Sequence, residues 1–103
     1  MTHFNIPFDG GNRLVQPENI IRVEALSNYS KIYFSNAKPM TVAKVLHWFQ
    51  DRLPPEMFAR VHRSHLVNKI FMHQINGNNR NTVLLLNGET IAISRRKRAV
   101  LSA

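Results

Sequence analysis

Short runs of apolar residues, many of them alternating with polar residues and each bounded by turn-forming residues, recur along this chain. Alternation with a period of two is typical of strands that bury one face, so the fold is expected to be mainly β. The expected strands are His3 to Phe8, Arg13 to Gln16, Ile20 to Leu26, Lys31 to Ser35, Ala59 to His62, Ile70 to Ile75, Thr82 to Leu86 and Glu89 to Ile93. A length of 103 residues with 44% apolar content favours one domain, residues 1–103.

Two reversals are marked by asparagine and glycine. Asn87-Gly88 tolerates the positive φ angles of a type I′ turn, so it predicts a hairpin between the last two expected strands. The segment Asn76 to Asn81 predicts another, looser reversal.

One segment has helical instead of strand periodicity, with apolar side chains at Val42, Val45, Leu46, Phe49 and Leu53. Thr41 is the expected N-cap, and Met40 is expected to pack on Val45 as a hydrophobic staple. Pro54-Pro55 is expected to end this amphipathic helix. A short C-terminal helix is expected from Arg95 to Leu101, with Ser94 as its N-cap.

The composition excludes several classes of protein. The chain has no cysteine, so it has neither disulfides nor thiolate metal sites. No basic leader with a long apolar core is present at the N-terminus, and no apolar run approaches the roughly 18 residues that span a bilayer. We therefore expect a cytoplasmic protein without a membrane partner.

The charge distribution points to a polyanionic partner. The formal net charge is +8, and residues 60–103 carry eight basic side chains but only one acidic side chain, Glu89. An anionic membrane surface would also fit the charge, but no expected helix combines a basic face with a long apolar face.

The segment from Phe58 to Asn68 mixes polar and apolar residues most densely. His62 and His65 lack the further ligands of a zinc site, and Ser64 has no orienting carboxylate for nucleophilic catalysis, so we expect no metal, no cofactor and no enzyme activity. Arg63 instead offers a planar fork of donors suited to guanine or to phosphate. His62 and Asn68 are expected to satisfy backbone groups and fix the turn.

Two other segments are candidates for the same surface. Ser94 to Arg98 places four cations at an expected helix start, where backbone N–H groups favour phosphate. The loop Ser27 to Lys31 is polar and compact, and by itself it indicates only a tight connection.

From about Asn19 to Leu101, the chain closely resembles the LytTR domain of bacterial response regulators. The resemblance lies in the order of five parts: RVEALSNYSKIYF, a helix ending near Asp51 to Leu53, FARVHRSHLVNKI, a hairpin, and ISRRKRAVL. The resemblance implies several small antiparallel sheets with a short helix. It also implies binding of double-stranded DNA by loops in successive major grooves, often at paired direct repeats that hold a second copy. Such domains usually follow a receiver domain, which these residues do not contain.

The resemblance implies specific contacts with DNA. Base-reading positions fall on Arg63, Arg96, Ser30 and Asn28, although family members often carry a longer side chain at the position of Ser30. Phosphate contacts are expected from Lys31, Ser64, Lys69, Arg95, Lys97 and Arg98. A protein-interaction module with a basic face and an RNA-binding module using Tyr29 and Tyr33 are the alternatives.

Overall fold

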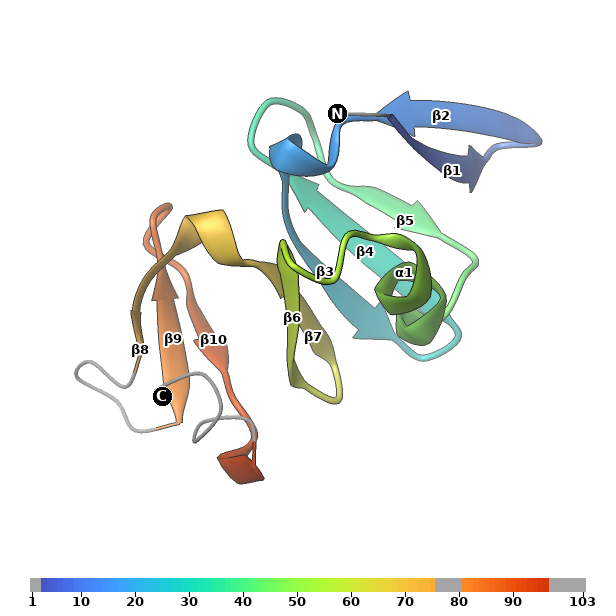
Figure 1. Cartoon of the computed structure of the whole chain (residues 1–103). Helices are drawn as coiled ribbons and strands as arrows, with labels where there is room; N and C mark the ends of the chain where they lie inside the picture. The colour runs from blue at the N-terminus through green and yellow to red at the C-terminus, as the bar shows by residue number, and fades with distance from the viewer. Residues whose placement is uncertain (1–2, 76–80, 97–103) are drawn as a thin grey trace.

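The computed structural model describes residues 3–75 and 81–96, which form three antiparallel sheets and a short helix (Figure 1). A two-stranded sheet pairs β1 (Phe4–Phe8) with β2 (Gly11–Val15). The five-stranded sheet has the order β5-β4-β3-β7-β6, and the three-stranded sheet has the order β10-β9-β8. The expectation of a mainly β fold with several small sheets is confirmed.

The remaining elements have the following bounds: β3 Ile20–Leu26, β4 Tyr29–Phe34, β5 Met40–Val42, α1 Leu46–Arg52, β6 Phe58–His62, β7 His65–Asn68, β8 Met72–Ile75, β9 Thr82–Leu85 and β10 Thr90–Ala92. Two 3₁₀ turns, η1 (Pro17–Asn19) and η2 (Lys69–Phe71), precede β3 and β8. Within the described ranges, no helix is long and apolar enough to cross a membrane.

The β9–β10 turn differs from the expectation, and the β1–β2 turn was not predicted. Asp9 (φ 52°) and Gly10 (φ 76°) connect Phe8 to Gly11 with two positive φ angles, as a type I′ turn requires. In the β9–β10 hairpin the positive φ is confined to Gly88 (φ 91°), whose N–H donates to the Leu85 carbonyl at 2.9 Å. The predicted hairpin is confirmed, but its type I′ turn is wrong, because glycine takes the left-handed position after a longer turn.

The amphipathic helix is shorter than expected. Helix α1 begins at Leu46 after an extended Val45, and its N-terminus has no side-chain cap. Met40–Val42 instead forms β5, in which Thr41 pairs with Lys31 of β4. The predictions of Thr41 as N-cap and of a Met40 staple are therefore wrong, because pairing with β4 takes these residues into the sheet. The helix ends at Arg52, before Pro54, as expected.

A strand that the sequence analysis missed, β7, follows the β6–β7 turn. Ile70, the expected start of the next strand, lies in η2, and β8 begins at Met72. The Asn68 side chain causes this bend, because it accepts a hydrogen bond of 3.1 Å from the N–H of Ile70. Arg95 and Arg96 have helical conformation, whereas the rest of the expected C-terminal helix and residues 76–80 lie outside the described residues.

Two apolar clusters hold the sheets together. The larger cluster packs one face of the five-stranded sheet against α1 and the β1–β2 hairpin, with Phe49 and Val23 fully buried. The second cluster joins the five-stranded sheet to the three-stranded sheet through Ile21, Val61, Val67, Val83, Leu85, Ile91 and Ile93. The second cluster thus places the end of β10 beside β6.

Candidate nucleic-acid interface

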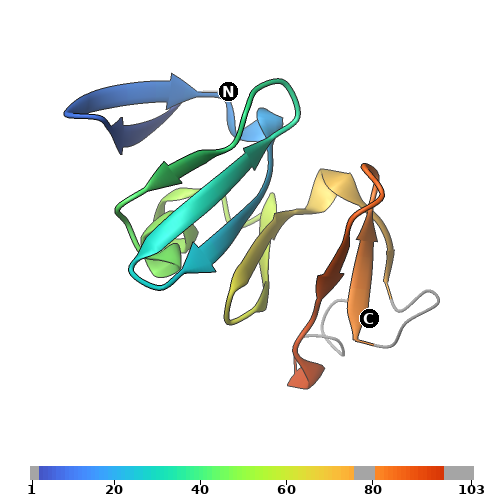
Figure 2. The same ribbon diagram turned by 180° about the vertical axis from the view of Figure 1, so that it is seen from behind.

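Three segments with expected DNA contacts lie along one side of the molecule. The β3–β4 turn, the β6–β7 turn and the end of β10 all lie at the lower side in Figure 1, and the reverse view in Figure 2 agrees. The fold therefore brings together loops that are up to about 70 residues apart in the sequence, as an extended interface for a long ligand requires.

Arg63 lies at the tip of the β6–β7 hairpin. His62 pairs with His65, so Arg63 and Ser64 form the two-residue connection. The Nδ1 atom of His62 accepts a hydrogen bond of 3.1 Å from the N–H of Ser64, and the Ser64 carbonyl accepts one of 2.9 Å from Ala25. The main chain of the turn is thus fixed, while the Arg63 side chain is exposed to solvent.

The Arg60 side chain binds the main chain of this turn, a role that the sequence analysis missed. Its guanidinium donates to the main-chain carbonyl of His62 at 2.9 Å and to the main-chain carbonyl of Arg63. A third hydrogen bond of 2.6 Å reaches Oε1 of Gln50 on α1. Burial lowers the pKa of Arg60 from its ordinary value. The arginine before the H-R-S motif was a possible signal, because a guanidinium can satisfy several carbonyls at once.

The end of β10 lies beside this turn. Ser94 donates its main-chain N–H to the Val61 carbonyl at 2.8 Å, which fastens the segment to β6. An open concavity is lined by His62, Arg63, Ser94, Arg95 and Arg96, and none of these described lining residues is acidic. Arg95 and Arg96 are both exposed. The two arginines expected to read bases, Arg63 and Arg96, are thus brought to one surface.

The β3–β4 turn places its two predicted base-reading residues differently. Asn28 is exposed at the tip, next to Ser27, whose φ is 57°. Ser30 is fully buried, and its hydroxyl donates a hydrogen bond of 2.7 Å to the main-chain carbonyl of Lys44. This placement contradicts a base contact by Ser30, because the hydroxyl joins two segments of the protein and is not open to a ligand.

The residues expected to contact phosphate do not all lie at this surface. Lys31 is half-buried near the β3–β4 turn, with its Nζ atom 5.2 Å from the centre of the Tyr33 ring. Lys69 is exposed but starts η2 at the opposite end of β7 from Arg63, so the structure does not bring it to this surface (Figure 1). Lys97 and Arg98 lie outside the described residues.

Asn68 lies at the end of β7 that is far from Arg63, and its side chain has a structural role. It is fully buried, and its amide donates hydrogen bonds to the carbonyls of Ile20 at 2.9 Å and Pro17 at 3.3 Å. These bonds join η1 and β3 to η2.

A row of polar residues crosses the five-stranded sheet just behind the turns. The strand register aligns Thr41, Lys31, Glu24, His65 and His62 on the five strands. Burial lowers the pKa of His65, and the charges of His62 and Arg22 lower it further, whereas the charge of Glu24 opposes this shift. No group of three or more His, Asp or Glu side chains suitable for a metal occurs in residues 3–75 and 81–96.

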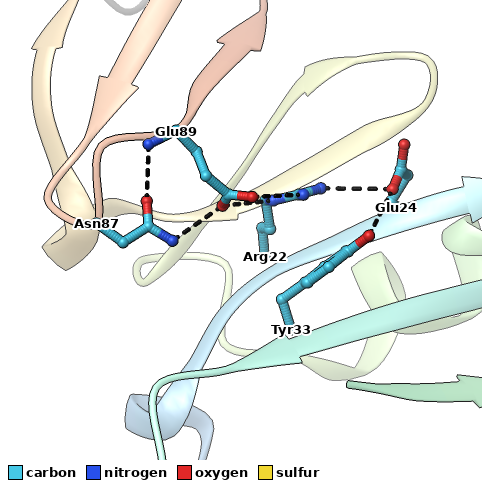
Figure 3. A network of polar contacts seen from close by, with 5 residues as sticks. All are labelled: Arg22, Glu24, Tyr33, Asn87 and Glu89. Carbon is cyan, nitrogen blue, oxygen red and sulfur yellow. Dashed lines mark hydrogen bonds and ion pairs between the residues drawn. The ribbon is translucent and has the colours of Figure 1, made fainter. Parts of the chain in front are cut away.

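Glu89, the acidic residue of the basic C-terminal half, is paired with Arg22. Arg22 donates from Nε to Oε1 at 3.0 Å and from a terminal nitrogen to Oε2 at 2.9 Å (Figure 3). The hydrogen bond from Arg22 lowers the pKa of Glu89, burial raises it, and a hydrogen bond from Asn87 lowers it again, with a net decrease. The sequence analysis missed this pair, although a charged residue inside an apolar strand pattern was a signal for it.

Comparisons with known proteins agree with this architecture. The family described as LytTr DNA-binding domain matches residues 10–103. The chain is 31% identical over 94 residues to the sensory transduction protein LytT of Enterococcus faecalis (strain ATCC 700802 / V583), covering 87% of this chain and 38% of that protein. A solved LytTr DNA-binding domain from Bacillus cereus has the same fold, with a TM-score of 0.78 and 21% identity over 98% of this chain and 94% of that one. The family match, which spans nearly the whole chain, shows that this chain belongs to the LytTR DNA-binding domain family.

Proposed function

We propose that the chain binds double-stranded DNA sequence-specifically, as the output domain of a bacterial transcription regulator, by inserting its turns into successive major grooves. The observation that carries this proposal is the shared concavity of Arg63 and Arg96, which has basic lining residues and no acidic one. An exposed arginine at a fixed turn can donate two parallel hydrogen bonds to O6 and N7 of guanine.

The proposed contacts are supported by the exposure of the described side chains, and those of Lys97 and Arg98 by the resemblance in sequence. Arg63 and Arg96 read bases, and Asn28 reads a base from the β3–β4 turn. Lys31, Ser64 and Arg95 contact phosphates, and Lys97 and Arg98 extend this set. Ser30 and Lys69 are left out, since Ser30 is buried and Lys69 lies at the far end of β7.

The dimensions support contact with more than one groove. The longest principal extent of the protein is 42 Å, and one turn of duplex DNA is about 34–36 Å long. Binding to paired direct repeats would then place two copies side by side on one face of the duplex, each with its own row of turns. This arrangement needs no stable dimer in solution.

Selection of preferred sites from random duplex DNA tests the proposal. We expect a defined motif, and competition by that duplex should exceed competition by the same duplex with its motif mutated. RNA of the same sequence should compete weakly, because its deep, narrow major groove does not admit side chains. Enrichment of no motif, or equal competition by mutated DNA, would support a general polyanion-binding or protein-interaction module instead.

A further inference from the structure

The contact between Arg22 and Glu89 joins two different sheets. Arg22 lies in β3 of the five-stranded sheet and is only 7% exposed, whereas Glu89 lies in the β9–β10 turn of the three-stranded sheet. The two residues are 67 positions apart in the sequence. Their geometry is bidentate, with each carboxylate oxygen accepting from a different guanidinium nitrogen.

We infer that Arg22 and Glu89 are positioning residues for DNA recognition, which fix how the sheet that carries Arg95 and Arg96 sits against the sheet that carries Arg63. This inference rests on the proposed function, because it concerns the relative placement of the two proposed base-reading arginines. Neither Arg22 nor Glu89 belongs to the proposed DNA contacts.

Both partners of the pair are themselves held in place. Asn87 donates a hydrogen bond of 2.9 Å to Oε1 of Glu89 and accepts one of 3.0 Å from its N–H. On the other side, the guanidinium of Arg22 lies 3.8 Å from the centre of the Tyr33 ring and 3.6 Å from Oε1 of Glu24 (Figure 3). Because both groups are restrained, the bidentate pair fixes the angle between the Arg22 guanidinium and the Glu89 carboxylate as well as the distance between them.

The second apolar cluster cannot supply this restraint by itself. Burial of apolar side chains is non-directional, so it holds the sheets together without choosing one orientation as sharply as a bidentate pair does. The main-chain hydrogen bond from Ser94 to Val61 attaches the three-stranded sheet next to the DNA-facing turns. The Arg22–Glu89 contact attaches the same sheet near its opposite end, at the β9–β10 turn (Figure 1). The chain also enters the three-stranded sheet at that end through η2, where Leu86 donates its N–H to the Phe71 carbonyl at 2.8 Å. The Arg22–Glu89 pair adds a direct side-chain contact to the five-stranded sheet, which restricts rotation of the three-stranded sheet about these attachments.

The double substitution R22M/E89M tests the inference. It removes both charges together, so no unpaired buried charge remains, and methionine fills the space with a flexible apolar chain. Two duplexes are compared: the best site selected by the wild-type protein, and the same site with one base pair inserted between the positions read by Arg63 and Arg96. Those positions are identified from the base pairs at which R63A and R96A lose preference.

We expect the insertion to weaken wild-type binding at least about tenfold, since misplacing one base contact costs roughly as much as a mismatch. In R22M/E89M, the best site should bind more weakly and the insertion penalty should fall below about threefold, because the two arginines are no longer held at one separation. The preferred bases themselves should not change. R22K, which keeps the charge but lacks the fork, should have an intermediate penalty.

A matched control is H47M/D51M, which removes the exposed ion pair of α1 and should keep the wild-type penalty. Melting temperatures identify folded variants, and if R22M/E89M does not fold, R22K and E89Q carry the same comparison. A folded variant without the fork that keeps the full insertion penalty would overturn the inference. Failure of the wild-type protein to select any duplex motif would instead overturn the proposed function, so the two failures are distinguishable.

Discussion

Arg60 donates a hydrogen bond to the main-chain carbonyl of Arg63, so one arginine fixes the backbone from which the other projects. The same guanidinium bonds to the His62 carbonyl and to Gln50, and its position on β6 leaves the Arg63 side chain exposed. The two arginines of the F-A-R-V-H-R segment therefore have different tasks. Arg60 organises the turn, and Arg63 is available to a ligand.

Replacement of Arg60 should weaken recognition without removing a DNA contact. We expect R60M to lower the free energy of unfolding by about 1–2 kcal/mol, because hydrogen bonds from a charged donor are lost. Discrimination between the best site and random DNA should also fall, since the turn becomes mobile. R60K should recover only part of this loss, because an ammonium lacks the planar fork. Urea unfolding and competition binding measure the two effects, with Q50A as the control that removes only the contact to α1.

Replacement of Arg63 should weaken DNA recognition without lowering the stability of the fold. Its side chain is exposed and has no hydrogen bond or ion pair with residues 3–75 and 81–96, so R63A should keep the wild-type melting temperature. The best site should lose about 1–3 kcal/mol of binding free energy, with relaxed preference at one base pair. R63K should rescue only part of this loss. Unchanged base preference in a folded R63A protein would remove Arg63 from the recognition surface.

The sequence predicts those parts of the fold that depend on local pattern. Strand β3 has the expected bounds, Ile20–Leu26, because apolar and charged side chains alternate from Ile21 to Ala25 and turn-forming residues flank the strand. The three-residue strand β5 could not be separated from the helix that follows, since Met40 and Val42 also fit a helical spacing. Which of the two periods applies is decided by pairing with β4, a long-range contact that the local sequence does not contain.

The candidate site could be predicted where one motif carries it. The H-R-S segment predicts the turn at Arg63. The burial of Ser30 could not be predicted in this way, because it results from tertiary packing that brings its hydroxyl to the carbonyl of Lys44, fourteen positions away. The Arg22–Glu89 pair depends on the packing of two sheets, and no local pattern reports that geometry. The alternation of β3 shows only that Arg22 shares a face with Glu24, so burial and partner follow from the tertiary structure.

Binding to any duplex should weaken steeply with salt. About four charged phosphate contacts, Lys31, Arg95, Lys97 and Arg98, give a slope of log K against log salt of about −3 to −4. R95A should reduce the magnitude of this slope by about one and weaken specific and random DNA equally. K69A makes the same change of charge at the far end of β7 and should leave the slope nearly unchanged. Equal effects of R95A and K69A would show a diffuse attraction instead of a defined surface.

Stability should depend on pH through His65, whose buried Nδ1 atom has no hydrogen-bond partner within residues 3–75 and 81–96. Burial lowers the pKa of His65 in the folded protein, whereas in the unfolded chain the pKa is about 6.5. The unfolded state therefore binds more protons between these two pKa values. The stabilising contribution is complete above about pH 6.5 and is lost as the pH falls through the folded-state pKa. We expect the free energy of unfolding, measured in urea, to fall as the pH drops below about 6.5, the pKa of the unfolded chain. This fall should be smaller in H65Q than in the wild-type protein.

The exposed His73 provides the control, because H73Q should keep the wild-type pH dependence. An H65Q protein that loses stability as steeply as the wild type over this range would show that other groups cause the dependence.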